Sequence, residues 1–399
     1  MVFDLRIHGF TNCVVASDLT DISQNLPTWN TIPRTTVKVA NGKTIEHFLT
    51  PLADASGVLF LPSYEWQKKV DSGTYGEIYL ANRRKYYRHF DDISGVIQFK
   101  AAATDTGELI AIKKTPIVLS TEEEKMSFPI RQNIIKEEIL AHIYEAAVLT
   151  LAYRAVEAAG LEHAVPRVYE IFCHTETPCT RITDIKDVCI SMEYILGDTL
   201  LRFMRENFKR TTDGTNDKIF LHFVSQIAKI LEILQSKLRM NHRDIKINNV
   251  LLRDKTSPMP LIVLIDYGFA CIANGVQEPA AEMSKIEAGS YFGSRYACFK
   301  KGRDMCQFLY SLHCYFPFDE YLSPAVLDLV KPWMLVNYKY GEANLLNGLK
   351  PNGHHSEERL KTLIFDEGIY ILLRRPEVDP LQCGPENILK DIDRFLTIV

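Results

Sequence analysis

The sequence has no cysteine pattern typical of a metal or redox site. Its nine cysteines are scattered over 399 residues, and none forms a C-x-x-C pair. Such pairs are typical of zinc sites and of thioredoxin-like redox centres, so the sequence indicates neither kind of site. Scattered cysteines fit reduced thiols, which are usual inside cells, and we therefore expect an intracellular protein.

Long apolar runs and a net positive charge are also missing. Asp4, Arg6 and His8 stand where a signal peptide needs an apolar stretch, and no later stretch is expected to be apolar enough to cross a bilayer. The formal net charge of −4 gives no overall field that would attract nucleic acid or an anionic membrane. The sequence therefore predicts a soluble protein without a membrane span or a nucleic-acid partner, and it leaves the oligomeric state open.

What the sequence does contain is 46% apolar residues, enough for a globular protein with a sizeable core. No internal repeat or low-complexity tract is evident. Residues 1–64 are expected to form an N-terminal extension of unknown role that is partly β. Its one clear signal is an alternating pattern over 35–39 followed by Asn41-Gly42, which predicts a strand entering a tight turn.

The remaining chain divides into a β-rich part and a mainly helical part. Residues 65–195 combine short strands with one main helix over 131–159, and an insertion over 83–104 separates two of the strands. The strand candidates are 77–81, 109–112, 165–172 and 188–195. The basic run over 83–88 either docks an acidic partner or, as we expect, is a solvated basic surface.

Residues 196–399 are expected to be mostly helical. An amphipathic helix begins near Asp217. Its predicted apolar face consists of Phe220, Phe223, Ile227, Ile230, Leu231 and Leu234. Further helices are predicted over 304–316, 323–338 and 385–398. Together the two parts predict an α+β fold.

Two polar triplets flank a predicted hairpin in the helical part. An H-R-D triplet ends at Asp244, and the apolar stretch 261–265 leads into a D-Y-G triplet that begins at Asp266. Phosphoryl transfer requires a protein to position a hydroxyl, hold a metal ion and neutralise charge on the moving phosphoryl group. Asp244 is suited to accept the hydroxyl proton, and Lys246 to steady the γ-phosphate of ATP. Asn249 and Asp266 offer the oxygen ligands that Mg²⁺ prefers.

Either triplet alone could be a chance surface sequence or an ordinary turn after a buried strand. Their aspartates, Asp244 and Asp266, are 22 positions apart with an apolar strand between them, which is the order expected of a phosphotransfer site. We include Arg243, which precedes Asp244, among the predicted catalytic residues. It can pair with a phosphate on the segment after the D-Y-G triplet, although a permanently ordered, unphosphorylated segment is equally compatible. The candidate acceptors there are Ser284, Ser290, Tyr291 and Ser294.

A glycine-rich turn lies upstream in the β-rich part. Its glycines are suited to bring backbone amides close to nucleotide phosphates, although the same pattern fits a plain hairpin turn. The predicted nucleotide-binding residues of this turn are Ser72, Gly73, Thr74, Tyr75, Gly76 and Ile78. Asp71 precedes them and would place a carboxylate near the phosphates.

A lysine on the strand after the insertion is the next candidate. Ala111 and Lys113 lie on a predicted strand from which the ammonium group could bind the α- and β-phosphates, although Lys113 could also be a solvated cation. Such a lysine needs a glutamate from the following helix. Glu137, Glu138 and Glu145 all lie there, and we select Glu138 because it precedes an apolar pair.

The end of the last strand in this part is a candidate for adenine binding. Glu193 and Ile195 precede Gly197, where a linker between the two parts is expected. Backbone groups of such a linker can form hydrogen bonds with adenine. A buried edge strand is the alternative.

The motifs from Gly73 to Asp266 resemble, in their order, those of the eukaryotic-type protein kinase superfamily over about residues 65–310. The resemblance implies a two-lobed fold with ATP in the cleft, a small, mainly antiparallel β lobe with one main helix, and a large, mainly α lobe. The lobes would be residues 65–195 and 196–399. A lysine two places after the aspartate, here Lys246, is similar to the pattern of serine/threonine kinases rather than that of tyrosine kinases.

One departure is the missing A-P-E triplet after Asp266. Residues 293–298, G-S-R-Y-A-C, resemble a stretch of the casein kinase one group, which also lacks that triplet. The D-Y-G triplet and the I-Y-L-A sequence over 78–81 are similar to vaccinia-related kinases within that group. We expect an ATP- and Mg²⁺-dependent kinase that acts on Ser or Thr of protein substrates. The alternatives are a pseudokinase-like scaffold without turnover and, third, a small-molecule kinase.

Overall fold

The structure is a computed structural model whose described residues form two units. It describes residues 35–38, 44–47, 52–53, 59–73, 76–91, 96–101, 107–174, 187–253, 257, 259–272, 299–338, 341–345, 373 and 380–398. Of these, unit 1 takes the residues up to Thr150 and those from Pro166 to Tyr194, and unit 2 takes Leu151–Val165 and the residues from Ile195 onward. The change between units at Tyr194–Ile195 lies beside the predicted domain boundary after residue 195.

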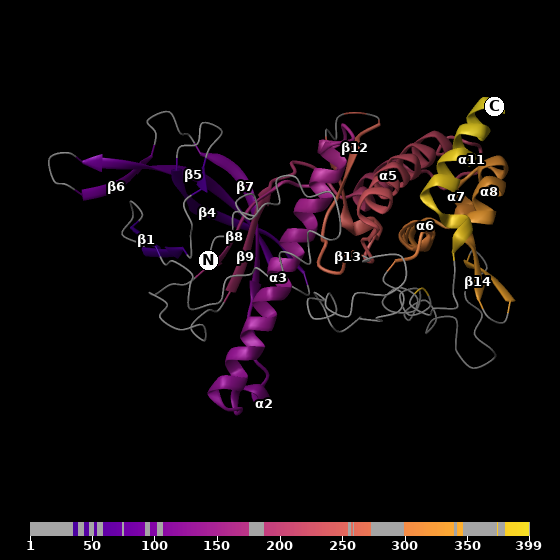
Figure 1. Ribbon diagram of the computed structural model, residues 1–399. Coiled ribbons are helices and arrows are strands. Elements are labelled where there is room, and N and C mark those ends of the chain that lie inside the picture. Colours follow the sequence, from indigo (N-terminus) through magenta and orange to yellow (C-terminus); the bar gives the residue numbers. More distant parts are fainter. Residues whose placement is uncertain are drawn as a thin grey trace. The chain divides into compact units, whose positions relative to one another are not determined.

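Unit 1 is built on an antiparallel sheet of seven strands in the order β3-β4-β5-β7-β9-β8, with β6 pairing to β5 (Figure 1). The strands are β3 Leu52–Ala53, β4 Leu59–Gly73, β5 Gly76–Asp91, β6 Val96–Ala101, β7 Glu108–Pro116, β8 Val168–His174 and β9 Asp187–Glu193. The strands predicted over 77–81 and 109–112 fall within β5 and β7, and those predicted over 165–172 and 188–195 overlap β8 and β9. Their β-branched and aromatic residues suit a half-buried pleated surface.

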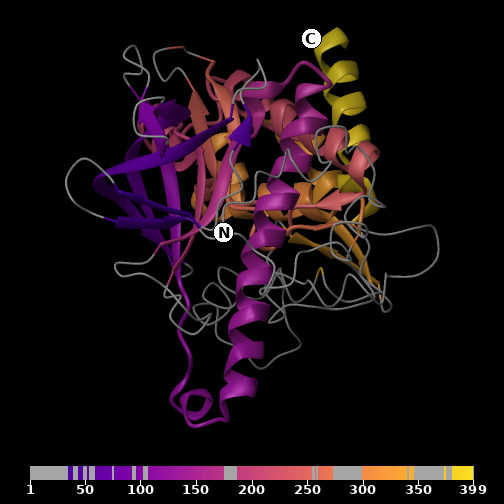
Figure 2. The same ribbon diagram turned by 60° about the vertical axis from the view of Figure 1, so that its left-hand side comes forward.

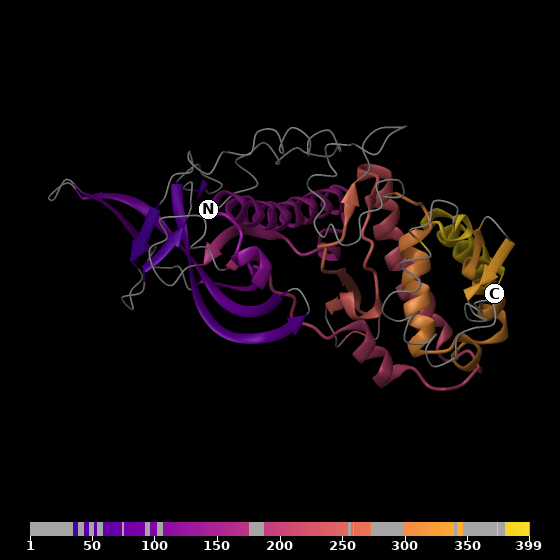
Figure 3. The same ribbon diagram turned by 90° about the horizontal axis from the view of Figure 1, so that it is seen from below.

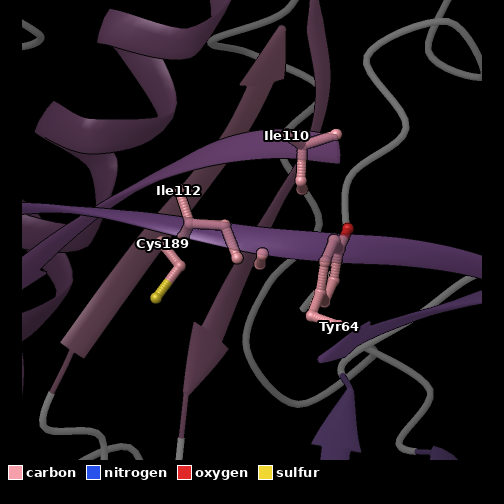
Figure 4. Packing of buried hydrophobic residues seen from close by; sticks show 5 residues of the cluster. Tyr64, Ile110, Ile112 and Cys189 are labelled. Carbon is pink, nitrogen blue, oxygen red and sulfur yellow. The ribbon is translucent and has the colours of Figure 1, made fainter. Parts of the chain in front are cut away.

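The core of this sheet gathers on one face of its central strands. Ile110 and Ile112 alternate along β7 and meet Tyr64 of β4 and Cys189 of β9 (Figure 4). The Tyr64 hydroxyl lies 3.3 Å from the Ser191 hydroxyl, so the buried phenol has a hydrogen-bond partner. Burial of these side chains fixes the strand register, because a one-residue shift would turn them to the opposite face.

The predicted insertion over 83–104 extends this sheet. Strand β5 continues to Asp91, and β6 returns antiparallel beside it. The first residues of β4 pair with the same extension, with Phe60 opposite Tyr87. Figure 3 shows how strongly these long strands curve. The last residues of the predicted N-terminal extension and the predicted insertion thus pair as strands of one sheet.

The basic run at the start of this extension is not a solvated surface throughout. Arg83 is buried, and its guanidinium group lies 3.6 Å from a Glu108 carboxylate oxygen and over the Tyr169 ring. Arg84 pairs with Glu65 at 3.4 Å. The prediction of a solvated basic face is therefore wrong for Arg83, because antiparallel pairing with β7 carries this residue into the sheet.

The N-terminal region contributes a separate two-stranded ribbon. β1 (Thr35–Lys38) and β2 (Thr44–His47) pair antiparallel, which confirms the strand predicted over 35–39. Lys38 and Thr44 form the pair nearest the turn. The predicted Asn41-Gly42 turn itself lies outside the described residues.

One long helix, α3 (Phe128–Glu157), accompanies the sheet. It confirms the predicted helix over 131–159 and spans about 45 Å at 1.5 Å per residue. The short helix α2 (Thr121–Glu124) lies at its N-terminal end (Figure 2). Ser120 and Glu123 form a reciprocal capping box that fixes the start of α2.

Unit 2 is mainly helical, as predicted. Its helices are α4 Leu200–Asn207, α5 Asp217–Leu238, α6 Arg303–Tyr315, α7 Phe318–Tyr321, α8 Pro324–Val330 and α11 Pro385–Ile398, with short 3-10 turns at Glu162–Ala164, Ile247–Asn249, Lys331–Met334 and Leu381–Cys383. All six residues predicted for the apolar face of α5 are buried. α11 packs on α5 (Figure 1), and the described part of the chain thus surrounds α5 with helices and short strands.

The helix predicted over 323–338 is wrong in its second half. After α8, residues Lys331–Met334 form a 3-10 turn and Leu335–Tyr338 form strand β14, which pairs with β15 (Gly341–Asn344). Pro332 lacks a backbone N–H donor and therefore favours a break in the helix. The apolar residues after it follow the two-residue period of a strand, whereas the prediction took them to follow the period of a helix.

Helix α6 begins against the C-terminal part of the chain. A Cβ atom added to Gly302 would lie 1.8 Å from the Pro380 carbonyl oxygen, so only glycine fits at the start of α6. This close approach joins the N-terminal end of α6 to the segment that leads into α11.

Two expectations from composition need correction. α5 is long and apolar enough, by length and composition, to cross a membrane, but more than half of its most apolar stretch is buried among the described residues, as in a core helix. It is weak evidence for a membrane span. Cys271 is disulfide-bonded, whereas Cys189, Cys306, Cys314 and Cys383 are free, so the expectation of reduced thiols fails for Cys271.

Candidate functional site

The two polar triplets lie between two short ribbons of unit 2. β10 (Met240–Asn241) pairs with β13 (Cys271–Ile272), and β11 (Val250–Arg253) pairs with β12 (Leu261–Leu264). The H-R-D triplet leaves the first ribbon, and the D-Y-G triplet leaves the second and leads back to the first. Residues far apart in sequence are thereby brought to the same part of the unit.

Backbone strain marks both triplets. Arg243 has a φ of 68° and Asp266 a φ of 67°, in the left-handed region that non-glycine residues seldom adopt. Such conformations persist where surrounding contacts determine them, and they are concentrated at functional sites.

Asp304 on α6 supplies those contacts for the H-R-D triplet. One carboxylate oxygen accepts hydrogen bonds from the backbone N–H of His242 at 2.8 Å and the side-chain amide of Asn241 at 2.9 Å. The other accepts from the backbone N–H of Arg243 at 2.9 Å. Asp304 is fully buried, so these donors satisfy its charge and fix the loop.

The sequence prediction missed Asp304 as a site residue. The only signal was its place in the R-D pair after Gly302, some 60 positions from the triplet that it holds. Neither spacing nor periodicity links residues at that separation, so the contact emerged only from the fold.

The predicted catalytic side chains cluster on the loop itself. The Asn249 side-chain amide donates to the Asp244 carbonyl oxygen at 2.9 Å and to its carboxylate at 2.8 Å. The Lys246 ammonium group lies 3.2 Å from the same carboxylate oxygen. Asp244 is buried while the Lys246 side chain is 44% exposed. The cluster therefore combines a fixed carboxylate with a lysine that can reach solvent and ligands.

Asn249 and Asp266 come together at one end of the β11–β12 ribbon. Val250 pairs with Leu264, and the backbone N–H of Ile265 donates to the Asn249 carbonyl oxygen at 3.1 Å. Asn249 thus immediately precedes the ribbon, and Asp266 follows it by two residues.

The Tyr267 side chain that follows Asp266 is buried beneath the loop. Its ring lies 4.4 Å from the His242 ring, centroid to centroid. Burial and, to a lesser extent, the charge of Asp304 raise the pKa of the Tyr267 hydroxyl. This packing places the D-Y-G triplet against the H-R-D triplet.

These residues fit a divalent cation held partly by a nucleotide. Because the Asn249 nitrogen already donates to Asp244, its amide oxygen is the atom oriented to accept a cation. Among the described residues, no three His, Cys, Asp or Glu side chains are grouped to hold a metal. Two protein oxygen ligands supplemented by phosphates are the arrangement that Mg²⁺ commonly adopts.

The glycine-rich turn forms the end of the β4–β5 hairpin in unit 1. Gly73 pairs with Gly76, and the predicted Thr74 and Tyr75 between them lie outside the described residues. Gly76 has a φ of 150°, and a Cβ atom there would lie 2.7 Å from the Lys114 carbonyl oxygen. Glycine is therefore required at this position for the close approach of β7.

Lys113 lies on β7 opposite Ile78 and binds Glu145 of α3. The ammonium nitrogen is 2.6 Å from one carboxylate oxygen, and both side chains are nearly buried. His142 Nδ1 lies 4.0 Å from the other oxygen. Burial opposes ionisation, but the charge of Lys113 and the interaction with His142 outweigh it, so the pKa of Glu145 lies below its ordinary value.

The selection of Glu138 as the partner of Lys113 is wrong. Glu138 is exposed, whereas Glu145 is buried. The two glutamates are seven positions apart, so they lie on nearly the same face of the helix about two turns from each other. The position of α3 along β7 brings Glu145, and not Glu138, to Lys113. Local sequence does not encode that position.

Of the predicted adenine-binding residues, Glu193 is the last residue of β9 and Ile195 follows it, while the predicted cofactor-binding residue Ala111 lies on the neighbouring β7. Ala111 pairs with Met192 and Ile110 with Glu193. The backbone N–H of Glu193 donates to the Arg167 carbonyl oxygen at 2.8 Å, so that donor is used within unit 1. Ile195 is buried and belongs to unit 2. Nucleotide binding by Ala111, Glu193 and Ile195 stays a prediction.

Comparison with known proteins identifies the family. Residues 94–294, about half of the chain, match the protein kinase domain. The chain is 27% identical over 113 residues to EKC/KEOPS complex subunit bud32 of Dictyostelium discoideum, which covers 28% of this chain and 42% of that protein. It is 27% identical over 126 residues to human death-associated protein kinase 2, which covers 31% of this chain and 32% of that protein.

The mouse death-associated protein kinase 2 is 32% identical over 92 residues, or 23% of each chain. The matches thus cover less than half the length of these curated relatives. The glycine-rich turn, residues 72–76, precedes the stretch that matches the kinase domain. The antiparallel unit with its single long helix, the mainly helical unit and the two triplets agree with that match, and the chain belongs to the eukaryotic-type protein kinase superfamily.

Proposed function

We propose that this chain transfers the γ-phosphate of ATP to serine or threonine hydroxyls of protein substrates, with Mg²⁺ as the metal. The observation that carries the proposal is the cluster of Asp244, Lys246 and Asn249, with Asp266 at the end of the adjoining ribbon. Phosphoryl transfer depends mainly on positioning and electrostatic stabilisation, and these residues supply both.

Asp244 is the residue that receives the substrate hydroxyl. Its carboxylate is held by the Asn249 amide, so it keeps one orientation and can accept the hydroxyl proton as the oxygen attacks phosphorus. Lys246 lies 3.2 Å from the same carboxylate and brings a positive charge to the side where negative charge develops.

Bound Mg²⁺ would offset negative charge on the nucleotide phosphates. Asn249 and Asp266 would hold the ion through one amide oxygen and one carboxylate. In unit 1, Lys113 would bind the phosphates of ATP while Glu145 fixes its ammonium group. Burial of this ion pair limits the motion of Lys113 and so keeps the charge in one place.

The choice of serine and threonine rests on Lys246 and on the distant match to death-associated protein kinase 2. Within the superfamily, the casein kinase one and vaccinia-related group is also a proposal. Of the residues that suggested it, 293–298 lie outside the described part of the chain, whereas 78–81 and 266–268 lie within it. The candidate phosphorylation sites that would pair with Arg243 also lie outside the described part.

The proposal is tested by phosphate transfer from labelled Mg-ATP to casein and to the chain itself. We expect phosphoserine or phosphothreonine on hydrolysis, and we expect Asp244→Asn to lower the rate by about 100-fold or more, the usual contribution of a positioned acid or base. Asp328→Asn on α8 is the matched control, because it removes an exposed carboxylate remote from the loop. Equal rates for wild type and Asp244→Asn would refute the proposal.

A second candidate is a scaffold that binds nucleotide without turnover. The observation that favours it is the Asp71 carboxylate at the glycine-rich turn, which accepts a backbone hydrogen bond there. This candidate would be supported if Mg-ATP raised the melting temperature while no phosphate reached any protein substrate. Measurable transfer that Asp244→Asn abolishes would exclude it.

A further inference from the structure

Asp71 lies at the end of the β4–β5 hairpin, where the chain approaches its glycine-rich turn. The strands pair Asp71 with Ile78, Ser72 with Glu77 and Gly73 with Gly76. Asp71 is therefore two residues from the turn itself, and its side chain is exposed. A carboxylate at this point stands beside the backbone amides that a phosphate group would approach.

The carboxylate already accepts a hydrogen bond from one backbone amide beside the turn. The backbone N–H of Ser72 donates a hydrogen bond to Asp71 Oδ1 at 2.8 Å. A carboxylate oxygen and a phosphate oxygen are both anionic acceptors, and both form charge-assisted bonds with a backbone donor. A phosphate oxygen that bound the Ser72 amide would therefore need the position that Asp71 Oδ1 holds.

Lys69, two residues before Asp71 on the same strand, binds mainly to a different carboxylate. The Lys69 ammonium group lies 2.6 Å from a Glu77 carboxylate oxygen, and the Tyr79 hydroxyl donates to the other oxygen at 2.7 Å. The hydrogen bond that Lys69 donates to Glu77 is the main cause of the raised pKa of Lys69, and the charge of Asp71 contributes least. Lys69 thus interacts mainly with Glu77 and only weakly with Asp71.

We propose that Asp71 is a specificity-determining residue that competes with nucleotide phosphates for the Ser72 amide. This inference rests on the proposed function, because it concerns the same nucleotide. Asp71 must leave the Ser72 amide when a phosphate binds, and its charge repels that phosphate. The penalty applies to phosphate groups and not to the nucleoside, so Asp71 reduces the preference of the chain for ATP over adenosine.

Direct binding to the full chain tests this inference. Dissociation constants for Mg-ATP and for adenosine are measured by calorimetry in wild type, Asp71→Ala and Asp71→Asn. We expect Asp71→Ala to bind Mg-ATP about tenfold more tightly, the equivalent of one charge-assisted hydrogen bond, with adenosine unchanged. Asp71→Asn keeps an acceptor for the Ser72 amide without the charge, so it should tighten Mg-ATP binding by a smaller factor.

The matched control is Glu65→Gln, which removes an exposed carboxylate six residues earlier on the same strand. It should leave both dissociation constants unchanged. The inference is overturned if Asp71→Ala binds Mg-ATP no more tightly than wild type, or if adenosine tightens equally. Failure of every variant to bind either ligand would overturn the proposed function as well. Tighter Mg-ATP binding without phosphate transfer supports the role of Asp71 and overturns only the proposed function.

Discussion

Replacing Asp304 by asparagine should destabilise the loop that carries the proposed catalytic residues. In the wild-type chain its two carboxylate oxygens accept three hydrogen bonds, from the backbone N–H groups of His242 and Arg243 and from the Asn241 amide. An asparagine has nearly the same shape, but its nitrogen would face a donor. At least one buried backbone N–H would then lose its acceptor.

The expected loss follows from that count. An unsatisfied buried donor costs about 1–3 kcal/mol, and losing the charge on the remaining bonds adds about 1 kcal/mol, so Asp304→Asn should lower the free energy of unfolding by about 2–4 kcal/mol. Urea denaturation followed by intrinsic fluorescence measures the change, and Asp328→Asn on the surface is the control. Phosphate transfer should fall in parallel, because Asp244 lies directly after the anchored residues. An unchanged urea midpoint with unchanged transfer would refute the anchoring argument.

Three further predictions concern the buried groups of the two units. Glu145→Gln should raise the KM for ATP about tenfold or more, because it releases Lys113. The control Glu138→Gln changes an exposed side chain and should leave this KM unchanged. Equal effects of the two variants in steady-state assays would contradict the pairing of Lys113 with Glu145. Because the pKa of Glu145 is lowered from 4.5, its contribution to stability is complete above about pH 4.5 and is lost as the pH falls further, so the Gln variant should show a flatter decline of stability in acid. The buried Tyr267 hydroxyl has no hydrogen-bond partner in the part of the chain that the structure describes, so Tyr267→Phe should raise the free energy of unfolding by about 1 kcal/mol; a lower urea midpoint for this variant would indicate a water-mediated partner.

The sequence was informative where the functional residues are neighbours or are joined by a hairpin. Asp244 and Asn249 are five positions apart, and the β11–β12 ribbon brings Asp266 to the same end, so motif spacing was enough to predict that they meet. Local pattern also predicted α5 and its buried face, because helical periodicity is recorded in adjacent residues.

Sequence reasoning failed where the answer depends on how elements lie against one another. Glu138 and Glu145 share a helix face, and only the placement of α3 along β7 distinguishes them. Asp304 acts on a loop some 60 positions away and has no local signature. The second half of 323–338 was assigned to a helix because its apolar residues satisfy either period, and its pairing with β15 decides in favour of a strand.

The close contact of Gly302 with Pro380 bears on when the chain can become active during its synthesis. The N-terminal end of helix α6 packs against Pro380, so its packing is complete only when that segment is present, and α11 packs on α5, the helix that leads into the proposed catalytic loop. Since Asp304 lies on α6, we expect the loop to acquire its anchor only after residues 380–398 have been synthesised. A ribosome-bound nascent chain that has not yet exposed residues 380–398 should therefore be inactive.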